Sequence, residues 1–166
     1  MNDLGLLVLR VGLGGLMMGH GGQKLFGWWR GHGPEGTGKM MESLGLSPGG
    51  FWARLAGASE FSGGGMTALG LMHPLGPLAI LGSMAMATFK AHADRPIWVT
   101  EGGAELPVTN SFIALALLLT GPGIFSVDRA LGLRMSPVSQ AVVILAGIGA
   151  LAYGLQPAEE PSPTAR

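Results

Sequence analysis

The sequence predicts an all-α membrane protein, and its composition and its charge-free segments both indicate that class. Hydrophobic residues make up 48% of the 166 residues and charged residues only 12%, with a mean hydropathy of +0.42. A soluble domain carries about 25% charged residues. Several long segments lack charge, and a transmembrane helix needs about 20 such residues. We therefore expect a four-helix transmembrane bundle followed by a fifth, C-terminal transmembrane helix.

The charge balance and the lack of cysteine exclude several functions. Ten basic and ten acidic residues leave no net charge, so we expect no nucleic-acid partner. The chain has no cysteine. Disulfides, thiolate catalysis, cysteine-ligated zinc and iron–sulfur clusters are therefore excluded for this chain, and we expect no metal site.

A helical hairpin is predicted in the middle of the chain. Residues 61–89 contain no Asp, Glu, Lys or Arg. These 29 residues are too many for a single crossing of the membrane. Two prolines and a glycine interrupt the segment at Met72–Pro77. The two helices of the hairpin should span about Phe51–Leu71 and about Gly76–Ala91.

Three further spans complete the prediction. Gly121-Pro122-Gly123 ends an uncharged segment, which places a span at about Leu106–Thr120. Val138–Leu155 is an apolar run of 18 residues. The first span, Leu4–Gly27, lacks the basic n-region and the cleavage site of a signal peptide, so we expect it to be retained.

These spans divide the chain into three parts. Residues 1–128 should form the four-helix membrane domain, and residues 129–155 should add the fifth helix. The tail, 156–166, is rich in proline and glutamate and is expected to be disordered.

The longest connection, Trp28–Gly50, is rich in glycine. Within it, Thr37–Leu46 places Met40, Met41 and Leu44 on one side of a helix. This spacing is typical of a short helix in the membrane interface, but an irregular surface loop fits the pattern equally well.

Small residues four positions apart indicate where helices pack closely. Gly15 and Gly19 form such a pair in the first span, and Ala146, Ala150 and Gly154 form a series in the fifth.

The distribution of basic residues predicts an orientation in the membrane. We call the surface that holds the N-terminus face A and the opposite surface face B. Face A receives three basic residues and face B seven. Those of face B are Lys24, Arg30, Lys39, Arg54, Lys90, Arg95 and Arg166. The positive-inside rule then places face B in the cytoplasm and the N-terminus outside.

Polar residues of the first four spans gather in the half of the bilayer nearest face B. His20 and Lys24 are four residues apart and share a helix face. Glu60 lies roughly 13 Å below face B at 1.5 Å per residue. The other members of this group are Lys90, His92, Glu101, Glu105 and Asn110. The first four helices therefore enclose a polar pocket that opens toward face B.

Glu60 is expected at the centre of this pocket. A charge at a helix centre costs about 2.5–3.5 kcal/mol on insertion scales, and glutamate is too short to reach the interface. Glu60 therefore needs a partner, a water pocket or a bound proton, and Lys24, His20 or both are the partners within reach. The alternative is a buried ion pair that only fixes the register of the helices.

Other polar residues also have structural interpretations. Lys24 and Arg54 suit interfacial anchors, and His20 suits a packing residue. His92 suits a solvated loop, although His20 and His92 could also be axial haem ligands. The four tryptophans, Trp28 among them, suit an aromatic belt. Arg10 and Asp128, near face A, could pair with each other.

Short motifs give the chain a resemblance to a known family. These motifs are Leu9-Arg10, His20-Gly21-x-Gln23-Lys24-Leu25-Phe26-Gly27, Glu60-Phe61-x-Gly63-Gly64, Leu69-Gly70-Leu71, Gly102-Gly103-x-Glu105 and Gly121-Pro122-Gly123-x-x-Ser126-x-Asp128. Together they resemble the DoxX family of bacterial membrane proteins over about Leu4–Asp128. The family is a four-helix bundle of the bacterial cytoplasmic membrane. Leu106 stands where the family often has an aromatic residue, and the fifth helix is an addition.

The resemblance implies a role in redox chemistry. Some relatives are subunits of a thiosulfate:quinone oxidoreductase, so quinone is the expected ligand. The motif positions His20, Lys24, Glu60 and Glu105 would then line the polar site as catalytic groups. Trp28, Lys90, His92 and Asn110 are candidates for ligand binding, whereas Arg10 and Asp128 look structural.

Three hypotheses of function follow. The first is a quinone-associated redox subunit that receives electrons from another membrane or peripheral subunit, from a non-covalent cofactor, or from a small anion such as thiosulfate. The second is a non-enzymatic scaffold or assembly partner for a peripheral redox protein. The third, a carrier of small molecules or ions, requires a homo-oligomer because five helices are few for alternating access.

Overall fold

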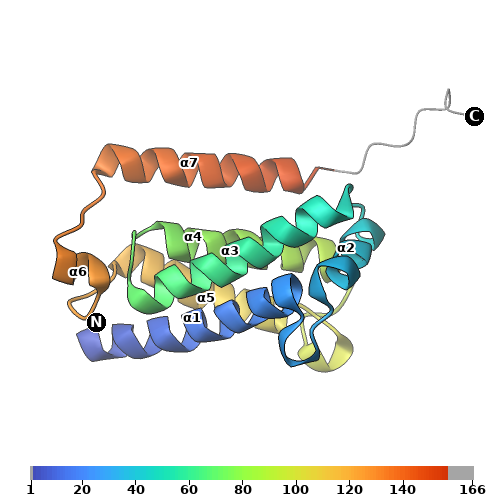
Figure 1. Ribbon diagram of the computed structural model, residues 1–166, viewed down its shortest axis with the longest axis horizontal. Coiled ribbons are helices and arrows are strands. Elements are labelled where there is room, and N and C mark those ends of the chain that lie inside the picture. The colour runs from blue at the N-terminus through green and yellow to red at the C-terminus, as the bar shows by residue number, and fades with distance from the viewer. Residues whose placement is uncertain (1, 157–166) are drawn as a thin grey trace, which may run out of the picture.

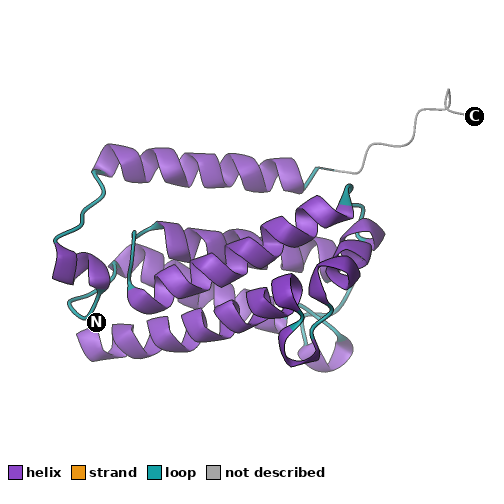
Figure 2. Ribbon diagram, viewed as in Figure 1, coloured by secondary structure: helices purple, strands orange, loops and turns teal. Residues whose placement is uncertain are grey.

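The computed structural model describes residues 2–156, which fold into seven α-helices with no β-strand among them (Figure 2). The helices are α1 (Asp3–Phe26), α2 (Gly33–Ser43), α3 (Gly49–Leu69), α4 (Leu75–Met86), α5 (Glu105–Thr120), α6 (Val127–Leu131) and α7 (Pro137–Gly154). A π-helical turn, Ala87–Ala91, extends α4, and 3₁₀ turns lie at Trp28–Arg30 and Val99–Glu101. Apart from Gln156, the tail that we expect to be disordered lies outside the described residues.

The five longer helices run along a common axis, so the molecule has two distinct ends (Figure 1). The α2 end holds α2 and the loop between α4 and α5, and it corresponds to face B. The α6 end holds the N-terminus and α6, and it corresponds to face A (Figure 1). The chain therefore alternates between two ends of the bundle (Figure 1).

Two of these helices are long and apolar enough to cross a membrane by themselves. They are α1 and α7. The α4 helix with its π turn and α5 are apolar but shorter. The α3 helix has 21 residues but carries Arg54 and Glu60. Each of the five predicted spans is thus a helix, with ends within two residues of the prediction except at the interrupted end of α4.

Local sequence explains where the helices begin and end. The Asn2 side chain accepts a hydrogen bond from the Leu4 amide and caps α1, and Ser136 caps α7 in the same way. Gly27 and Gly70 end α1 and α3 in the left-handed conformation, with φ of 70° and 63°. Only glycine adopts that conformation without steric cost, so both stops are built into the sequence.

The helices α1 and α3 pack backbone to backbone through glycines. A Cβ atom on Gly14 would lie 2.5 Å from the Gly64 carbonyl oxygen, and one on Gly64 would lie 2.6 Å from that of Gly14. A Cβ on Gly21 would lie 2.7 Å from the Gly57 carbonyl oxygen. Any larger residue at these positions would separate α1 from α3, and with them the polar groups that they carry.

The small-residue patterns predicted only part of this packing. The pair Gly15 and Gly19 is not the contact, because a Cβ on Gly15 would meet nothing within 4 Å and one on Gly19 would meet only Trp29. The contact lies on the adjacent face of the same helix. In α7, Gly154 does pack closely, because a Cβ atom added to it would lie 3.1 Å from the Met86 sulfur.

The apolar core lies between α1, α4 and α5. Its buried members are Leu6, Leu13, Met17, Ile80, Met84, Ala114 and Leu117. A smaller cluster joins α2 to α3 through Met41, Leu46 and Ala53. The α2 segment is therefore a helix and not an irregular loop, and Pro34 in its first turn lets it begin at Gly33 rather than at Thr37.

The α7 helix lies to one side of the bundle, against α4 (Figure 1). Most of its side chains are exposed in the isolated chain, as expected for a helix that faces lipid. Near its C-terminal end, Tyr153 stacks on Trp52 of α3 with ring centroids 6.4 Å apart.

At the α6 end, a buried arginine ties three segments together. Arg10 of α1 is 3% exposed. Its guanidinium donates hydrogen bonds to the backbone carbonyls of Thr67 at 3.2 Å, Ala68 at 3.0 Å and Phe125 at 3.0 Å, and also to that of Pro122. Arg10 therefore connects α1 with the end of α3 and with the loop before α6.

Asp128 holds the neighbouring turn. Both of its carboxylate oxygens accept backbone hydrogen bonds at 2.8 Å, one from Met72 and one from His73. Within the described residues Arg10 and Asp128 form no ion pair with each other, and each binds backbone instead. We call these two residues and their backbone partners the Arg10–Asp128 clamp.

Candidate functional site

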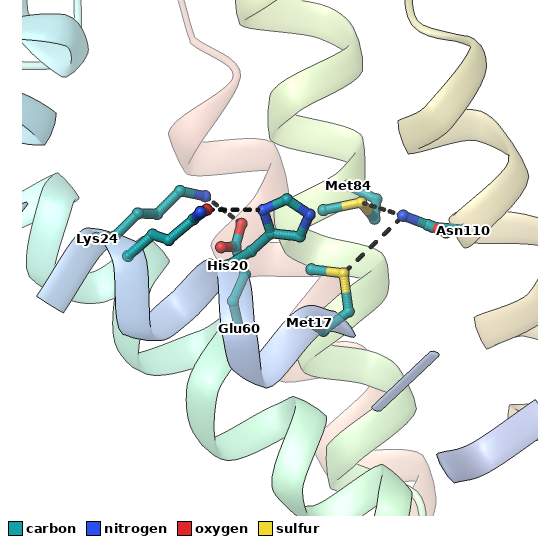
Figure 3. A network of polar contacts seen from close by, with 7 residues as sticks. Met17, His20, Lys24, Glu60, Met84 and Asn110 are labelled. Atoms are coloured by element: carbon teal, nitrogen blue, oxygen red, sulfur yellow. Dashed lines mark hydrogen bonds and ion pairs between the residues drawn. The ribbon is translucent and has the colours of Figure 1, made fainter. Parts of the chain in front are cut away.

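An ion pair between α1 and α3 forms the centre of the candidate site. Lys24 lies in the last turn of α1 and Glu60 near the middle of α3. The Lys24 ammonium donates a hydrogen bond to Glu60 Oε1 (Figure 3). The Glu60 side chain is 3% exposed and that of Lys24 is 26% exposed. The carboxylate therefore points into the bundle and meets one of the two bases that the sequence offered.

The second carboxylate oxygen of Glu60 lacks a partner. Glu60 Oε2 is buried, and no donor within the described residues reaches it. An unsatisfied buried acceptor costs about 1–3 kcal/mol, and more when it is charged. Glu60 thus keeps an unused capacity to accept a hydrogen bond or a proton.

His20 does not take part in this ion pair. Its side chain is exposed, and its Nδ1 lies 3.2 Å from Gln23 Oε1 on the same helix. No hydrogen bond or ion pair within residues 2–156 joins His20 to Glu60. In the described structure, Lys24 alone pairs with the acid.

Asn110 of α5 lies beside two methionines. Its side-chain nitrogen is 4.0 Å from the Met17 sulfur and 3.9 Å from the Met84 sulfur (Figure 3). Sulfur is a weak acceptor, so these contacts satisfy the amide only in part. The cluster joins α1, α4 and α5 in the same half of the bundle as Glu60.

Two other predicted residues stabilise the loop between α4 and α5. The Glu105 carboxylate accepts a hydrogen bond from the Val99 amide at 2.9 Å, and His92 Nδ1 lies 2.7 Å from the Gly102 carbonyl oxygen. Both side chains therefore serve the loop in this structure, and neither contacts the Lys24–Glu60 pair.

The remaining candidates lie around the α2 end. Trp28 packs against Phe26 and Phe61, with ring centroids 5.2 and 5.7 Å apart. Lys90, in the π-helical turn, donates to the Gln156 carbonyl oxygen at 2.9 Å and so joins the end of α4 to the end of α7.

The Lys24–Glu60 pair lies in the wall of an apolar groove of about 380 Å³. The groove runs between α3, α4 and α7, and α2 covers one end. Its polar lining consists of Lys24, Ser59, Glu60, Ser83 and Lys90. Its apolar lining includes Met40, Met41, Leu44, Leu46, Trp52, Leu55, Leu75, Leu78, Met86, Val143 and Leu151. An apolar cavity with a few convergent polar groups is the usual form of a small-molecule site.

The prediction that the first four spans enclose the pocket was wrong: α7 forms one wall of the groove, Lys24 is the one lining residue of α1, and no residue of α5 lines it. Met40, Met41 and Leu44 share a side of α2, as predicted, and that side faces the groove. Ser59, Ser83 and the α7 residues carry no motif that would mark them. The one sequence signal on α7 is the pair of small residues Gly147 and Ala150, one turn apart, which indicates a helix face with space beside it.

No group of three or more His, Asp or Glu side chains suited to a metal ion occurs among the described residues. His20 and His92, the two histidines considered as haem ligands, make separate contacts with Gln23 and Gly102. The chemistry of the groove is therefore that of an ammonium–carboxylate pair with apolar walls.

The helical fold, the apolar helix surfaces and this charge pair inside the bundle define the class of protein. It is a helical integral membrane protein with a polar site between its helices. A family model named DoxX matches residues 5–93, just over half of the 166 residues, so the chain belongs to the DoxX family. The matched segment runs from α1 to the end of the π-helical turn and ends before Glu105. No curated protein and no solved structure matches the chain.

Proposed function

We propose that this protein binds a quinone in the groove and serves as the quinone-binding membrane subunit of an oxidoreductase. One observation carries the proposal: a buried carboxylate, paired with a lysine and with one oxygen unused, lies in the wall of an otherwise apolar groove. A structural ion pair has no need of such a groove.

The two charged groups match the head group of a quinone in both of its redox states. A lysine ammonium has three donors, and only one is used on Glu60. The others can donate to a quinone carbonyl oxygen. A quinol presents hydroxyl groups, which the unused carboxylate oxygen can accept. The pair can therefore bind either form.

The shape of the groove suits a lipophilic tail. Its lining extends along α4 from Leu75 to Ala91, about 24 Å at 1.5 Å per residue. In a membrane the tail reaches these walls from lipid, so its binding gains van der Waals packing and not a transfer from water. The polar groups lie part of the way along this length, so a head group at Glu60 leaves apolar wall for the tail.

Reduction of a quinone to a quinol takes up two electrons and two protons. Glu60 is placed to deliver a proton to a head group bound beside it. The second proton comes from water. The two electrons come from another subunit, a non-covalently bound cofactor or a substrate. Two thiosulfate ions, oxidised together to one tetrathionate, would supply them, and the exposed part of Lys24 and Lys90 would attract their negative charge.

The proposal includes a topology. All five long helices cross the bacterial cytoplasmic membrane, with the α2 end in the cytoplasm and the N-terminus outside. The apolar length of α1 and α7 and the position of the basic residues support it. Cysteines introduced singly at Ser43 and Arg134, labelled in intact cells, would place the two ends.

Groove-filling variants test the binding site directly. A Cβ on Gly147 meets nothing within 4 Å, so Gly147→Leu fits α7 and fills part of the groove. Gly149→Leu is the matched control, because Gly149 is equally open but does not line the groove. In nanodiscs, decylubiquinone should quench the fluorescence of Trp52. Gly147→Leu should weaken binding by about tenfold, or about 1.4 kcal/mol, and Gly149→Leu should not.

Charge variants test the head-group contacts. Glu60→Gln removes the proton donor and should abolish quinone reduction while the protein still folds. Glu35→Gln is the control, because Glu35 forms an exposed ion pair with Lys39 at 2.9 Å. Absence of decylubiquinone binding to the wild-type protein would overturn the proposal. Binding without reduction, even with co-purified subunits and thiosulfate, would leave a quinone-binding scaffold instead of an oxidoreductase subunit.

A further inference from the structure

A second hollow, of about 550 Å³, lies at the α6 end of the molecule, away from the groove. Two arginines in and after α6 line it, together with residues of the N-terminus, the turn after α3 and the start of α7. The charged residues of its lining are Asp3, Asp128, Arg129 and Arg134.

The two acids of this hollow are already used by the fold. Both oxygens of Asp128 accept backbone hydrogen bonds within the clamp. Asp3 Oδ1 accepts a hydrogen bond from the Ile124 amide at 3.1 Å. Of the four carboxylate oxygens of Asp3 and Asp128, Asp3 Oδ2 is the one that accepts no hydrogen bond within the described residues.

The two arginines are not used. Within residues 2–156, neither the Arg129 nor the Arg134 side chain forms an ion pair or a hydrogen bond. Both residues are exposed. Two guanidinium groups beside one hollow offer paired donors in the planar geometry that phosphate oxygens prefer.

The rim of the hollow is apolar. Ile124 and Leu133 line the hollow and are 56% and 46% exposed, and the nearby residues Phe125 and Leu131 are 53% and 66% exposed. In a membrane protein such side chains at the end of a bundle lie among lipid acyl chains near the interface. A ligand of this hollow therefore meets donors for phosphate and, directly beside them, surface for acyl chains.

We propose that Arg129 and Arg134 bind the phosphate of a membrane phospholipid at the α6 end, with a preference for an anionic head group. A zwitterionic choline lipid is less suited, because its quaternary ammonium would lie close to the two guanidinium groups. The site is separate from the groove, and its occupant is a structural lipid of the leaflet at that end.

Native mass spectrometry of the detergent-purified full chain tests this assignment. Phosphatidylglycerol, phosphatidylcholine and inorganic phosphate are the three probes. The double variant R129Q/R134Q should bind phosphatidylglycerol about tenfold more weakly than the wild-type chain, which corresponds to about 1.4 kcal/mol. The control R30Q/R54Q removes the same charge from two exposed arginines that lie outside this hollow, and it should bind as the wild type does.

Each other outcome contradicts part of the assignment. An equal loss of phosphatidylglycerol binding in R30Q/R54Q would mean that the lipid responds only to the net charge of the protein. Unchanged binding in R129Q/R134Q removes the site. Displacement of phosphatidylglycerol by millimolar inorganic phosphate would make it a site for free anions, and equal affinity for phosphatidylcholine would remove the anionic preference. All substituted residues are exposed, so loss of the fold does not confound the comparison.

Discussion

Two groups of charged residues are buried in the bundle, one at its α6 end and one near the middle of α3, and their hydrogen bonding differs. In the Arg10–Asp128 clamp, the guanidinium binds four backbone carbonyls and the carboxylate binds two backbone amides. In the Lys24–Glu60 pair, each side chain binds one partner, the other side chain, and one carboxylate oxygen is left unsatisfied.

The difference separates a structural role from a functional one. Polar groups that exist for stability are satisfied when buried, because an unmet donor or acceptor costs free energy. The charged groups of the clamp follow that rule and close two turns, although the neighbouring Thr67 hydroxyl is buried without a partner among the described residues. The Glu60 carboxylate does not follow it, and it borders the groove. Arg10 borders a void of about 10 Å³, and Asp128 lines the second hollow with both of its oxygens satisfied. We infer that the clamp serves the fold and that the pair serves a ligand.

The largest predicted effect is on the clamp. Arg10→Met removes four hydrogen bonds from a charged donor, and each such bond contributes about 1.5–3 kcal/mol. We expect the free energy of unfolding in detergent to fall by about 6 kcal/mol or more, with little folded protein recovered. Size-exclusion chromatography and thermal unfolding measure the loss, with the exposed Arg54→Met as control. A monodisperse Arg10→Met protein with wild-type melting would refute the structural role of the clamp.

A smaller loss is expected when the pair is broken from one side. Lys24→Met leaves the Glu60 carboxylate buried without a counter-ion, which costs about 3 kcal/mol. Thermal unfolding in detergent measures the loss, with the exposed Lys39→Met as control. A Lys24→Met protein that melts as the wild type does would contradict a stabilising role for the pair.

Replacement of both partners should cost almost no stability. Lys24→Met with Glu60→Leu replaces an incompletely satisfied pair by apolar side chains, a change that is often neutral or stabilising by about 1–4 kcal/mol. Decylubiquinone binding should nevertheless be lost. A double variant that still binds quinone as the wild type does would separate the groove from the pair.

The smallest effect concerns His73, in the turn that the clamp holds. Burial lowers the pKa of His73 below its ordinary value of 6.5, against the opposing influence of the Asp128 carboxylate. The folded state therefore favours neutral histidine. Above pH 6.5 the histidine is neutral in both states and its contribution is constant. As the pH falls below 6.5, the unfolded state gains protons first and stability decreases.

His73→Gln should remove this part of the pH dependence. Its melting temperature should decline less than that of the wild-type protein between pH 6.5 and the lower pKa of the folded histidine. His32→Gln, at an exposed position in the loop before α2, is the control. A melting temperature that declines more steeply in His73→Gln than in the wild-type protein would contradict the expected direction.

Sequence patterns were sufficient where a local rule applies. The Met72–Pro77 turn, the glycine at the end of α1 and the Gly121-Pro122-Gly123 stop follow from backbone geometry that proline and glycine impose on their neighbours. The Met40, Met41 and Leu44 spacing indicated α2, which the structure confirms as a helix. The short α6 helix has too few residues for any periodicity, and it was not predicted.

The packing of α1 shows where such patterns are insufficient. Glycines stand at several positions of α1, and the spacing of four between Gly15 and Gly19 marked the wrong face. Gly14 and Gly21, seven apart, make the contact. The same rotation explains His20: it shares one side of the helix with Lys24 by spacing, but small differences in angle leave the histidine outside and the lysine against Glu60.

The sequence by itself determined that this chain is helical and apolar, where its five longer helices lie, and that a glutamate would lie within a span. These properties depend on residues close together in the chain. Only the tertiary structure decided which base meets that glutamate, that one of its oxygens stays unpaired, and that α7 leaves a groove beside it. Such contacts depend on how the helices are rotated and spaced, and residues far apart in the sequence set those rotations together.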